Sequence, residues 1–174
     1  QVIEKGTLLI KDGKVVASGT TVTIPKNSTI IDATGKSIYP SFIDIYSSFG
    51  VEKPKRQGGG RSAQYDASRT GYYWNDHVMP ENNAIDKFNY DSKKADELIK
   101  AGFGVVNTHI QDGIIRGTGT LVALNNDDGN EVRVLDTRSA QYLSFSKSLT
   151  SNQAYPSSIM GSMALLRQMY LDAD

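Results

Sequence analysis

The chain has 174 residues, with 19 basic and 19 acidic side chains, two histidines and no cysteine. The balanced charge argues against a general nucleic-acid binder and against a protein that binds membrane surfaces. There is no apolar run of about 18 residues that could span a membrane. Without cysteine, the chain forms no disulfide and no zinc ribbon, and it has no thiol nucleophile.

The first forty residues have the pattern of short β-strands. Strands are predicted at 7–10, 15–19, 21–24 and 29–33. Asp12-Gly13, between the first two, favours the positive φ values of a tight hairpin turn. Four short strands separated by turns at this spacing predict a small sandwich or barrel.

The next strand and the segment after it have a different character. Residues 41–46 lack clean polar alternation, which predicts a strand buried on both faces. Residues 50–91 are polar, include the glycines 58–60, and are predicted to form a mobile loop. Within that segment, Asp76-His77 is a candidate metal-binding or acid–base pair that rests on two adjacent residues alone.

The second half of the chain alternates helix and strand. A helix is predicted over 91–101, capped by Asp91 or Ser92 and ended by Gly102, and an apolar strand follows at 104–109. Helix, glycine and strand form one step of an α/β fold with a parallel sheet. Strands at 119–124 and 131–135 predict a hairpin around the turn 125–130.

A last helix is predicted to start at 155–158. Its expected apolar face contains Ile159, Met163, Leu166 and Met169 or Tyr170. The methionines of this helix, Met160, Met163 and Met169, are predicted to fill the core rather than to bind a ligand.

Three stretches near the N-terminus carry a family resemblance. They are residues 9–19 (LIKDGKVVASG), 31–36 (IDATGK) and 40–44 (PSFID). Their order, spacing and chemistry resemble the N-terminus of the amidohydrolase superfamily, in the style of its imidazolonepropionase-like and dihydroorotase-like members. Residues 98–106 (LIKAGFGVV) resemble the helix–strand step that follows in that family.

The resemblance implies an α/β architecture of two parts. Residues 1–40 would form strands of a small β-sandwich, a composite domain completed by strands from the far C-terminus. Residues 41–174 would begin a TIM-like (β/α) barrel that is incomplete in this chain, with a long polar loop at about 50–90. The activity implied is metal-dependent hydrolysis of C–N bonds in amides or cyclic amides.

The chain departs from the family pattern at the metal ligands. In the family, the first barrel strand ends in His-x-His. Alternate strand residues share a face, so both imidazoles reach a metal, usually zinc, which converts bound water to hydroxide near neutral pH. Here the two positions are Tyr46 and Ser48, which are poor zinc ligands. The substitutions predict a degenerate, non-catalytic portion that binds no metal or other cofactor.

A few other polar residues remain as candidates. Asp44 and His109 are weak catalytic candidates; the alternatives are an aspartate that binds loop backbone and a histidine that only packs. The residues predicted to line a pocket with them are Tyr46, Ser48, Gln111 and Asp112.

Three functions stay open at this point. The first is the degenerate amidohydrolase-like domain. The second is an active C–N hydrolase whose rearranged metal site is completed by residues outside this sequence. The third is a glycan- or peptide-binding module whose aromatic surface contains Tyr46, Tyr72, Tyr73, Trp74 and Tyr90.

The ends of the sequence suggest a longer protein. The chain opens at Gln1, close to a strand, and stops at Asp174, directly after a helical pattern. The predicted partner is therefore the remainder of the same polypeptide. The absence of an initiator Met, together with a composition rich in Tyr, Asn, Ser and Gly, favours an exported protein, periplasmic or extracellular.

Overall fold

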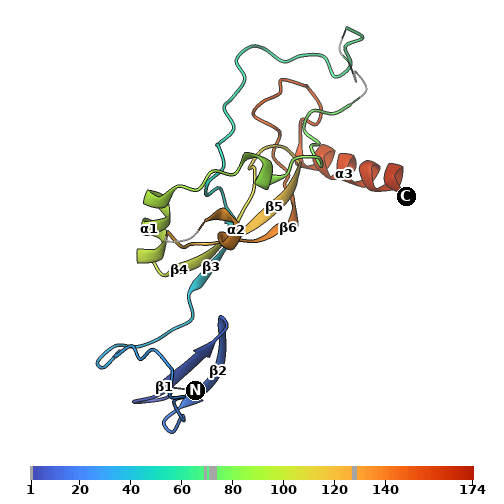
Figure 1. The fold of residues 1–174 in the computed structure, drawn as a ribbon. Helices are drawn as coiled ribbons and strands as arrows, with labels where there is room; N and C mark the ends of the chain where they lie inside the picture. Colours follow the sequence, from blue (N-terminus) through green and yellow to red (C-terminus); the bar gives the residue numbers. More distant parts are fainter. Residues whose placement is uncertain (1, 69, 71–73, 127–128) are drawn as a thin grey trace. The chain divides into compact units, whose positions relative to one another are not determined.

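In a computed structural model, the chain divides into two compact units, Gln1–Pro40 and Ser41–Asp174. The structure describes residues 2–68, 70, 74–126 and 129–174. Figure 1 traces the elements of each unit. The fold is mixed α/β, with one small sheet in the first unit and a larger one in the second.

The first unit is built on one hairpin. Strands β1 (Thr7–Lys11) and β2 (Lys14–Gly19) pair antiparallel. The predicted turn is confirmed, because Asp12 and Gly13 both have positive φ, 51° and 70°. The strands predicted at 21–24 and 29–33 are wrong for the described residues, which show turns and irregular backbone there. A strand requires a neighbouring ladder of hydrogen bonds, and this unit supplies none to those segments.

A four-stranded sheet organises the second unit. It consists of β3 (Phe42–Ser47), β4 (Phe103–Thr108), β5 (Ile115–Ala123) and β6 (Val134–Leu143), in that order. The β3–β4 pair is parallel and the other two pairs are antiparallel. The sheet is open, with β3 and β6 at its edges.

The predicted helix at 91–101 is confirmed as α1 (Ser92–Lys100), which lies alongside β4 (Figure 1). The Asp91 side chain caps it by accepting hydrogen bonds from the backbone N–H groups of Lys93 and Lys94. Gly102 follows with φ of 94°, as expected for a glycine that ends a helix. The helix covers a core formed by Phe49, Ala95, Val106, Val122 and Leu124.

The predicted hairpin is confirmed as the β5–β6 pair, with different bounds. The predicted strand residues 131–133 instead belong to a short helix, α2 (Asn130–Arg133). The Arg133 guanidinium explains this turn, because it donates to the backbone carbonyls of Asn125 (2.5 Å) and Asn126 (3.1 Å). The chain therefore forms a short helical turn before it enters β6.

The prediction that residues 41–46 are buried on both faces is wrong for this unit. Phe42, Ile43 and Ile45 of β3 are 66%, 58% and 72% exposed. The physical reason is position, because an edge strand of an open sheet is covered only where a layer packs on it.

Part of the segment 50–91 pairs with the sheet, contrary to the prediction of a mobile loop. Its second half contains a 3₁₀ turn, η1 (Ala84–Lys87), and it returns beside β5 (Figure 1) through bridges of Val78 to Ile115 and of Asn83 to Thr118. His77 and Val78 are fully buried. The mobile-loop prediction is therefore wrong for residues 77–83, whose backbone pairs with β5 and the residue before it.

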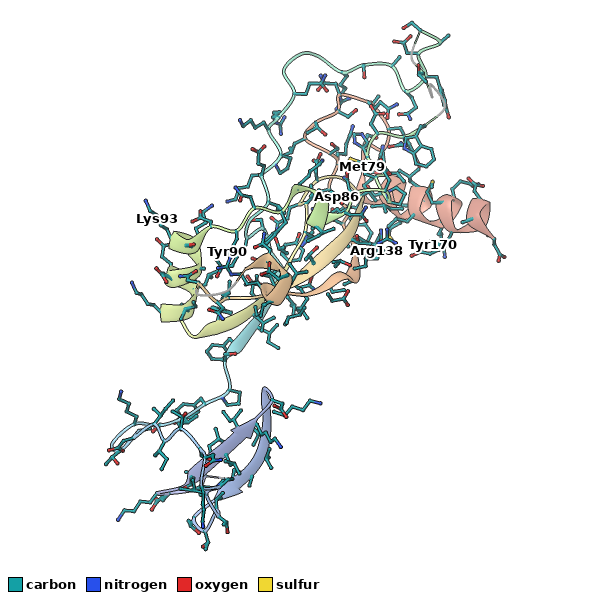
Figure 2. The ribbon with its side chains drawn as sticks, in the orientation of Figure 1. Met79, Asp86, Tyr90, Lys93, Arg138 and Tyr170 are labelled. Carbon is teal, nitrogen blue, oxygen red and sulfur yellow. The ribbon has the colours of Figure 1, made fainter. Side chains whose placement is uncertain are left out.

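The last helix, α3 (Ile159–Ala173), is confirmed and is capped by Ser158, whose hydroxyl accepts from the Gly161 N–H at 3.1 Å. Its methionines do not all fill a core. Met160 and Met163 are 81% and 51% exposed, and Tyr170 is also exposed (Figure 2). None of the helices in the described part of the chain has the length and apolar character needed to cross a membrane.

Candidate functional site

Four side chains from four strands or strand ends meet in unit 2. Tyr46 lies near the end of β3, His109 directly after β4, Arg116 near the start of β5, and Tyr142 near the end of β6. The parallel pairing of Ser47 with Thr108 brings the ends of β3 and β4 together, and the His109 N–H donates to the Ser47 carbonyl at 3.1 Å. We call these four residues the Arg116 cluster.

The rings of the cluster pack closely. The imidazole of His109 stacks on the Tyr142 ring, with centroids 3.6 Å apart and planes 2° from parallel. Tyr46 meets the imidazole edge-on, at a centroid distance of 4.7 Å. The Tyr142 hydroxyl donates to the carbonyl of Ile45 at 2.6 Å, which ties β6 to β3. His109 is fully buried by these contacts.

Arg116 is a buried cation in this cluster, with 7% of its surface exposed. Its Nε donates to the Gly113 carbonyl at 3.1 Å, and its Nη1 donates to the Tyr46 hydroxyl oxygen at 2.5 Å. Nη1 also lies 3.5 Å from His109 Nε2. Since a guanidinium can only donate, this contact assigns the imidazole lone pair to Nε2 and the proton to Nδ1. The buried Nδ1 has no hydrogen-bond partner among the described residues.

The electrostatics of the cluster keep His109 neutral. Burial, and next the charge of Arg116, lower the pKa of His109 from 6.5 to about 4, while the Asp44 carboxylate opposes this shift. Burial is also the main cause that raises the pKa of the Tyr142 phenol, with smaller contributions from Asp44 and Tyr46. At neutral pH the cluster therefore has a single cation, Arg116, and His109 has no acidic proton to supply.

A guanidinium lies against possible metal-ligand atoms of the cluster. Arg116 Nη1 contacts the Tyr46 hydroxyl and the Nε2 lone pair of His109, two of the atoms in the cluster that could act as ligands. The others are Nδ1 of His109 and the Tyr142 hydroxyl. Over the residues that the structure describes, no group of three or more His, Asp or Glu side chains is arranged to hold a metal ion.

The structure brings together some of the predicted site residues. Tyr46 and His109 are in contact, and Asp44 acts on His109 through its charge. The Asp44 carboxylate also accepts from the Tyr46 backbone N–H at 3.0 Å, the structural role considered as the alternative. Ser48 and Gln111 are half-buried, and no described side-chain contact joins either residue to the Arg116 cluster.

Asp112 lies in a second polar cluster. Its carboxylate accepts three hydrogen bonds of 2.7 Å, from the backbone N–H of Leu149 and from the hydroxyls of Ser148 and Thr150. These bonds give it a structural role in fixing the segment after β6.

His77 belongs to the same region. Its Nδ1 accepts from the backbone N–H of Ser148 at 3.1 Å, and its Nε2 lies 3.3 Å from the Gln153 carbonyl. Burial lowers the pKa of His77. Because backbone groups occupy both ring nitrogens and the Asp76 carboxylate instead accepts from the Ser151 hydroxyl at 2.8 Å, the geometry gives no support to an Asp76–His77 acid–base pair.

The aromatic residues of the binding-module hypothesis lie in separate surroundings. Tyr90 packs against Phe49 in the core beside α1 (Figure 2), with the Arg133 guanidinium 4.0 Å from its ring centroid. Trp74 is 39% exposed and lines a surface hollow of about 280 Å³ with Asp76, Glu81 and Thr150. Tyr46 lies in the Arg116 cluster, and Tyr72 and Tyr73 are outside the described residues.

Sequence reasoning did not identify Arg116 and Tyr142. The signal for Arg116 was a charged residue directly after Ile114-Ile115 and before Gly117, in a stretch that is otherwise typical of a buried strand. A charge in such a strand is expected to have a partner or a function. Nothing local distinguishes Tyr142 from the other tyrosines.

Comparisons with known proteins support the fold alone. No family model matches the sequence, and no curated protein matches it. A crystal structure of an amidohydrolase from Thermotoga maritima MSB8 is similar, with a TM-score of 0.65 and 21% identity, over 95% of this chain and 42% of that one. The chain therefore has an amidohydrolase-like fold and spans less than half the length of that protein.

Proposed function

We propose that this chain is the N-terminal portion of an amidohydrolase-like protein, and that this portion is degenerate and does not catalyse hydrolysis itself. One observation carries the proposal. The guanidinium of Arg116 contacts Tyr46, at the position of a family metal ligand, and faces the lone pair of His109. A fixed cation thus lies where a catalytic metal would need donor atoms.

Electrostatics make the two cations incompatible. A divalent ion about 4 Å from a guanidinium would be repelled by about 8 kcal/mol at an effective dielectric constant of about 20. The neutral imidazole of His109 could ligate through Nε2 only if Arg116 moved away, and Arg116 is held by Gly113 and Tyr46. Tyr46 and Ser48 add no charge that would offset the repulsion.

The partner we propose is the remainder of the same polypeptide. Two features support this: the exposed apolar side chains of edge strand β3, and Ile30 and Ile31 of the first unit, which are 72% and 86% exposed. Apolar surface of this kind is normally covered. Further strands would complete a composite sandwich and a TIM-like barrel, and a zinc site, if the protein has one, would then be formed by residues outside this sequence.

Metal content tests the proposal. The full chain, purified without chelators, is analysed for zinc, manganese, iron and cobalt, and is assayed on peptides, cyclic amides and isoaspartyl substrates with and without chelator. We expect His109→Gln and Tyr46→Phe to leave both the metal content and any hydrolysis unchanged. Stoichiometric metal that is lost in both variants, together with chelator-sensitive turnover, would establish the alternative of an active hydrolase with a rearranged site.

A further inference from the structure

We propose that Arg116 and Tyr46 form a binding site for a single carboxylate group. This inference goes beyond the proposed function, which concerns metal chemistry, and it concerns what the Arg116 cluster binds instead.

Two unused donors lie side by side in the cluster. The Tyr46 hydroxyl oxygen accepts from Arg116 Nη1, so its own hydrogen is left to donate. Neither that hydrogen nor Arg116 Nη2 has an acceptor among the residues that the structure describes. Nη1 links the two groups, so a planar acceptor with two oxygens can bind both. A carboxylate has this shape.

Burial favours an anionic partner for Arg116. The side chain is only 7% exposed, and no carboxylate among the described residues forms an ion pair with it. A buried charge without an ion-pair partner is costly, and an anion that binds it directly reduces that cost. Tyr46 as a whole residue is 53% exposed, so the site borders on solvent at this residue.

The charge balance favours a monoanion. His109 is neutral at pH 7, which leaves Arg116 as the one cation of the cluster, and the Asp44 carboxylate is near enough to affect both His109 and Tyr142. A single guanidinium balances the charge of a carboxylate, whereas a doubly charged phosphate would leave one negative charge unbalanced near Asp44. The carboxylate could belong to a small ligand or to an Asp or Glu elsewhere in the same polypeptide.

His109 provides a reporter for the site. The chain contains two histidines, and His77 lies apart from Arg116, with both ring nitrogens bound to backbone groups. Ring ¹⁵N spectra of the full chain are recorded while acetate replaces chloride at constant ionic strength. We expect a saturable shift of His109 without a shift of His77, and no response to acetamide, which has the same shape without the charge.

Variants separate the site from a general salt effect. We expect Arg116→Gln to abolish the acetate response, and Tyr46→Phe, which keeps the ring and removes one donor, to weaken it about tenfold. Arg138→Gln is the matched control, because Arg138 is exposed on β6 (Figure 2), and it should leave the response intact. If Arg116→Gln fails to fold, Tyr46→Phe still decides the question.

The outcomes distinguish the source of the carboxylate. An acetate response identifies a site for a free ligand. Without one, an Asp or Glu carboxyl other than Asp44 whose pKa rises in Arg116→Gln, and not in Arg138→Gln, identifies a carboxylate of the same polypeptide. The proposal is overturned if neither of these results is obtained. An equal response to acetamide, or a stronger response to phosphate, also overturns it. These results do not depend on metal content, so the failure of one proposal is distinguishable from that of the other.

Discussion

The imidazole of His109 lies face to face with the phenol ring of Tyr142, 3.6 Å away and within 2° of parallel. The stack removes His109 from water and leaves Nε2 facing Arg116. A histidine in this setting is uncharged at neutral pH and acts as an acceptor that positions the guanidinium. The neutral state of His109 and the fixed position of the guanidinium therefore follow from the burial of these two side chains.

The first prediction concerns the pH dependence of stability. The folded-state pKa of His109, about 4, is below the ordinary value of 6.5, so between these values the unfolded state binds the extra proton. The free energy of unfolding should therefore fall as the pH falls from 6.5 to about 4, by about 3 kcal/mol in total from His109. Urea unfolding at several pH values measures this loss.

The control for this prediction is His109→Phe, which keeps an aromatic ring in the stack and removes the titration. Its free energy of unfolding should depend less on pH over the same window. His77 contributes with the same sign, because its pKa is also lowered, so some dependence will remain. Identical pH profiles for the variant and the parent chain would show that His109 titrates normally in the folded state.

The second prediction concerns the two charges next to His109. Arg116 lowers the pKa of His109 and Asp44 raises it. Arg116→Gln should therefore raise that pKa, still leaving it below 6.5 because burial is the larger cause, and Asp44→Asn should lower it further. NMR titration of the His109 ring measures both. Shifts in the same direction for the two variants would contradict the geometry of the cluster.

The third prediction concerns Asp112. Replacing it with Asn turns one acceptor oxygen into a donor that faces the hydroxyls of Ser148 and Thr150. We expect Asp112→Asn to lower the free energy of unfolding by about 3 kcal/mol, measured by urea unfolding. Asp136→Asn is the control on exposed β6 and should change it by less than about 0.5 kcal/mol. Equal losses of unfolding free energy in the two variants would mean that the hydrogen bonds of Asp112 do not stabilise the fold.

The fourth prediction concerns Gly117. Its φ is 81°, and a Cβ atom added there would collide with the backbone carbonyl of Asn82. Gly117→Ala should therefore destabilise unit 2 by more than about 2 kcal/mol and separate the segment 82–83 from β5. Gly58→Ala, where a Cβ meets no neighbouring atom, is the matched control and should be close to neutral. Thermal unfolding of both variants gives the comparison.

Local signals in the sequence predicted the local parts of the fold. Asp12-Gly13 predicted the hairpin turn, and Asp91 and Gly102 predicted the ends of α1, because each acts on hydrogen bonds within a few residues. The strands predicted at 21–24 and 29–33 failed because a strand depends on a partner that the same segment does not contain. The burial predicted for β3 failed for a related reason, since an edge strand is covered only by what packs on it.

The candidate site was predicted in part. Tyr46 and His109 were identified because the family pattern and the strand ends marked their positions. Arg116 was not identified, because its contact with Tyr46 joins residues 70 positions apart and depends on the order β3-β4-β5. The charge that argues most strongly against a metal therefore became visible only when the strands were placed side by side.

The central claim is that Arg116 keeps a metal ion away from His109. The most direct test is a zinc titration of the full chain, monitored through the ring ¹⁵N signals of His109. We predict that zinc leaves these signals unchanged, because Arg116 faces Nε2. We also predict that they respond to zinc when Arg116→Met is combined with Tyr46→His and Ser48→His, which restores the His-x-His of the family's first barrel strand. A stoichiometric shift of the His109 signals in the unaltered chain would contradict the account.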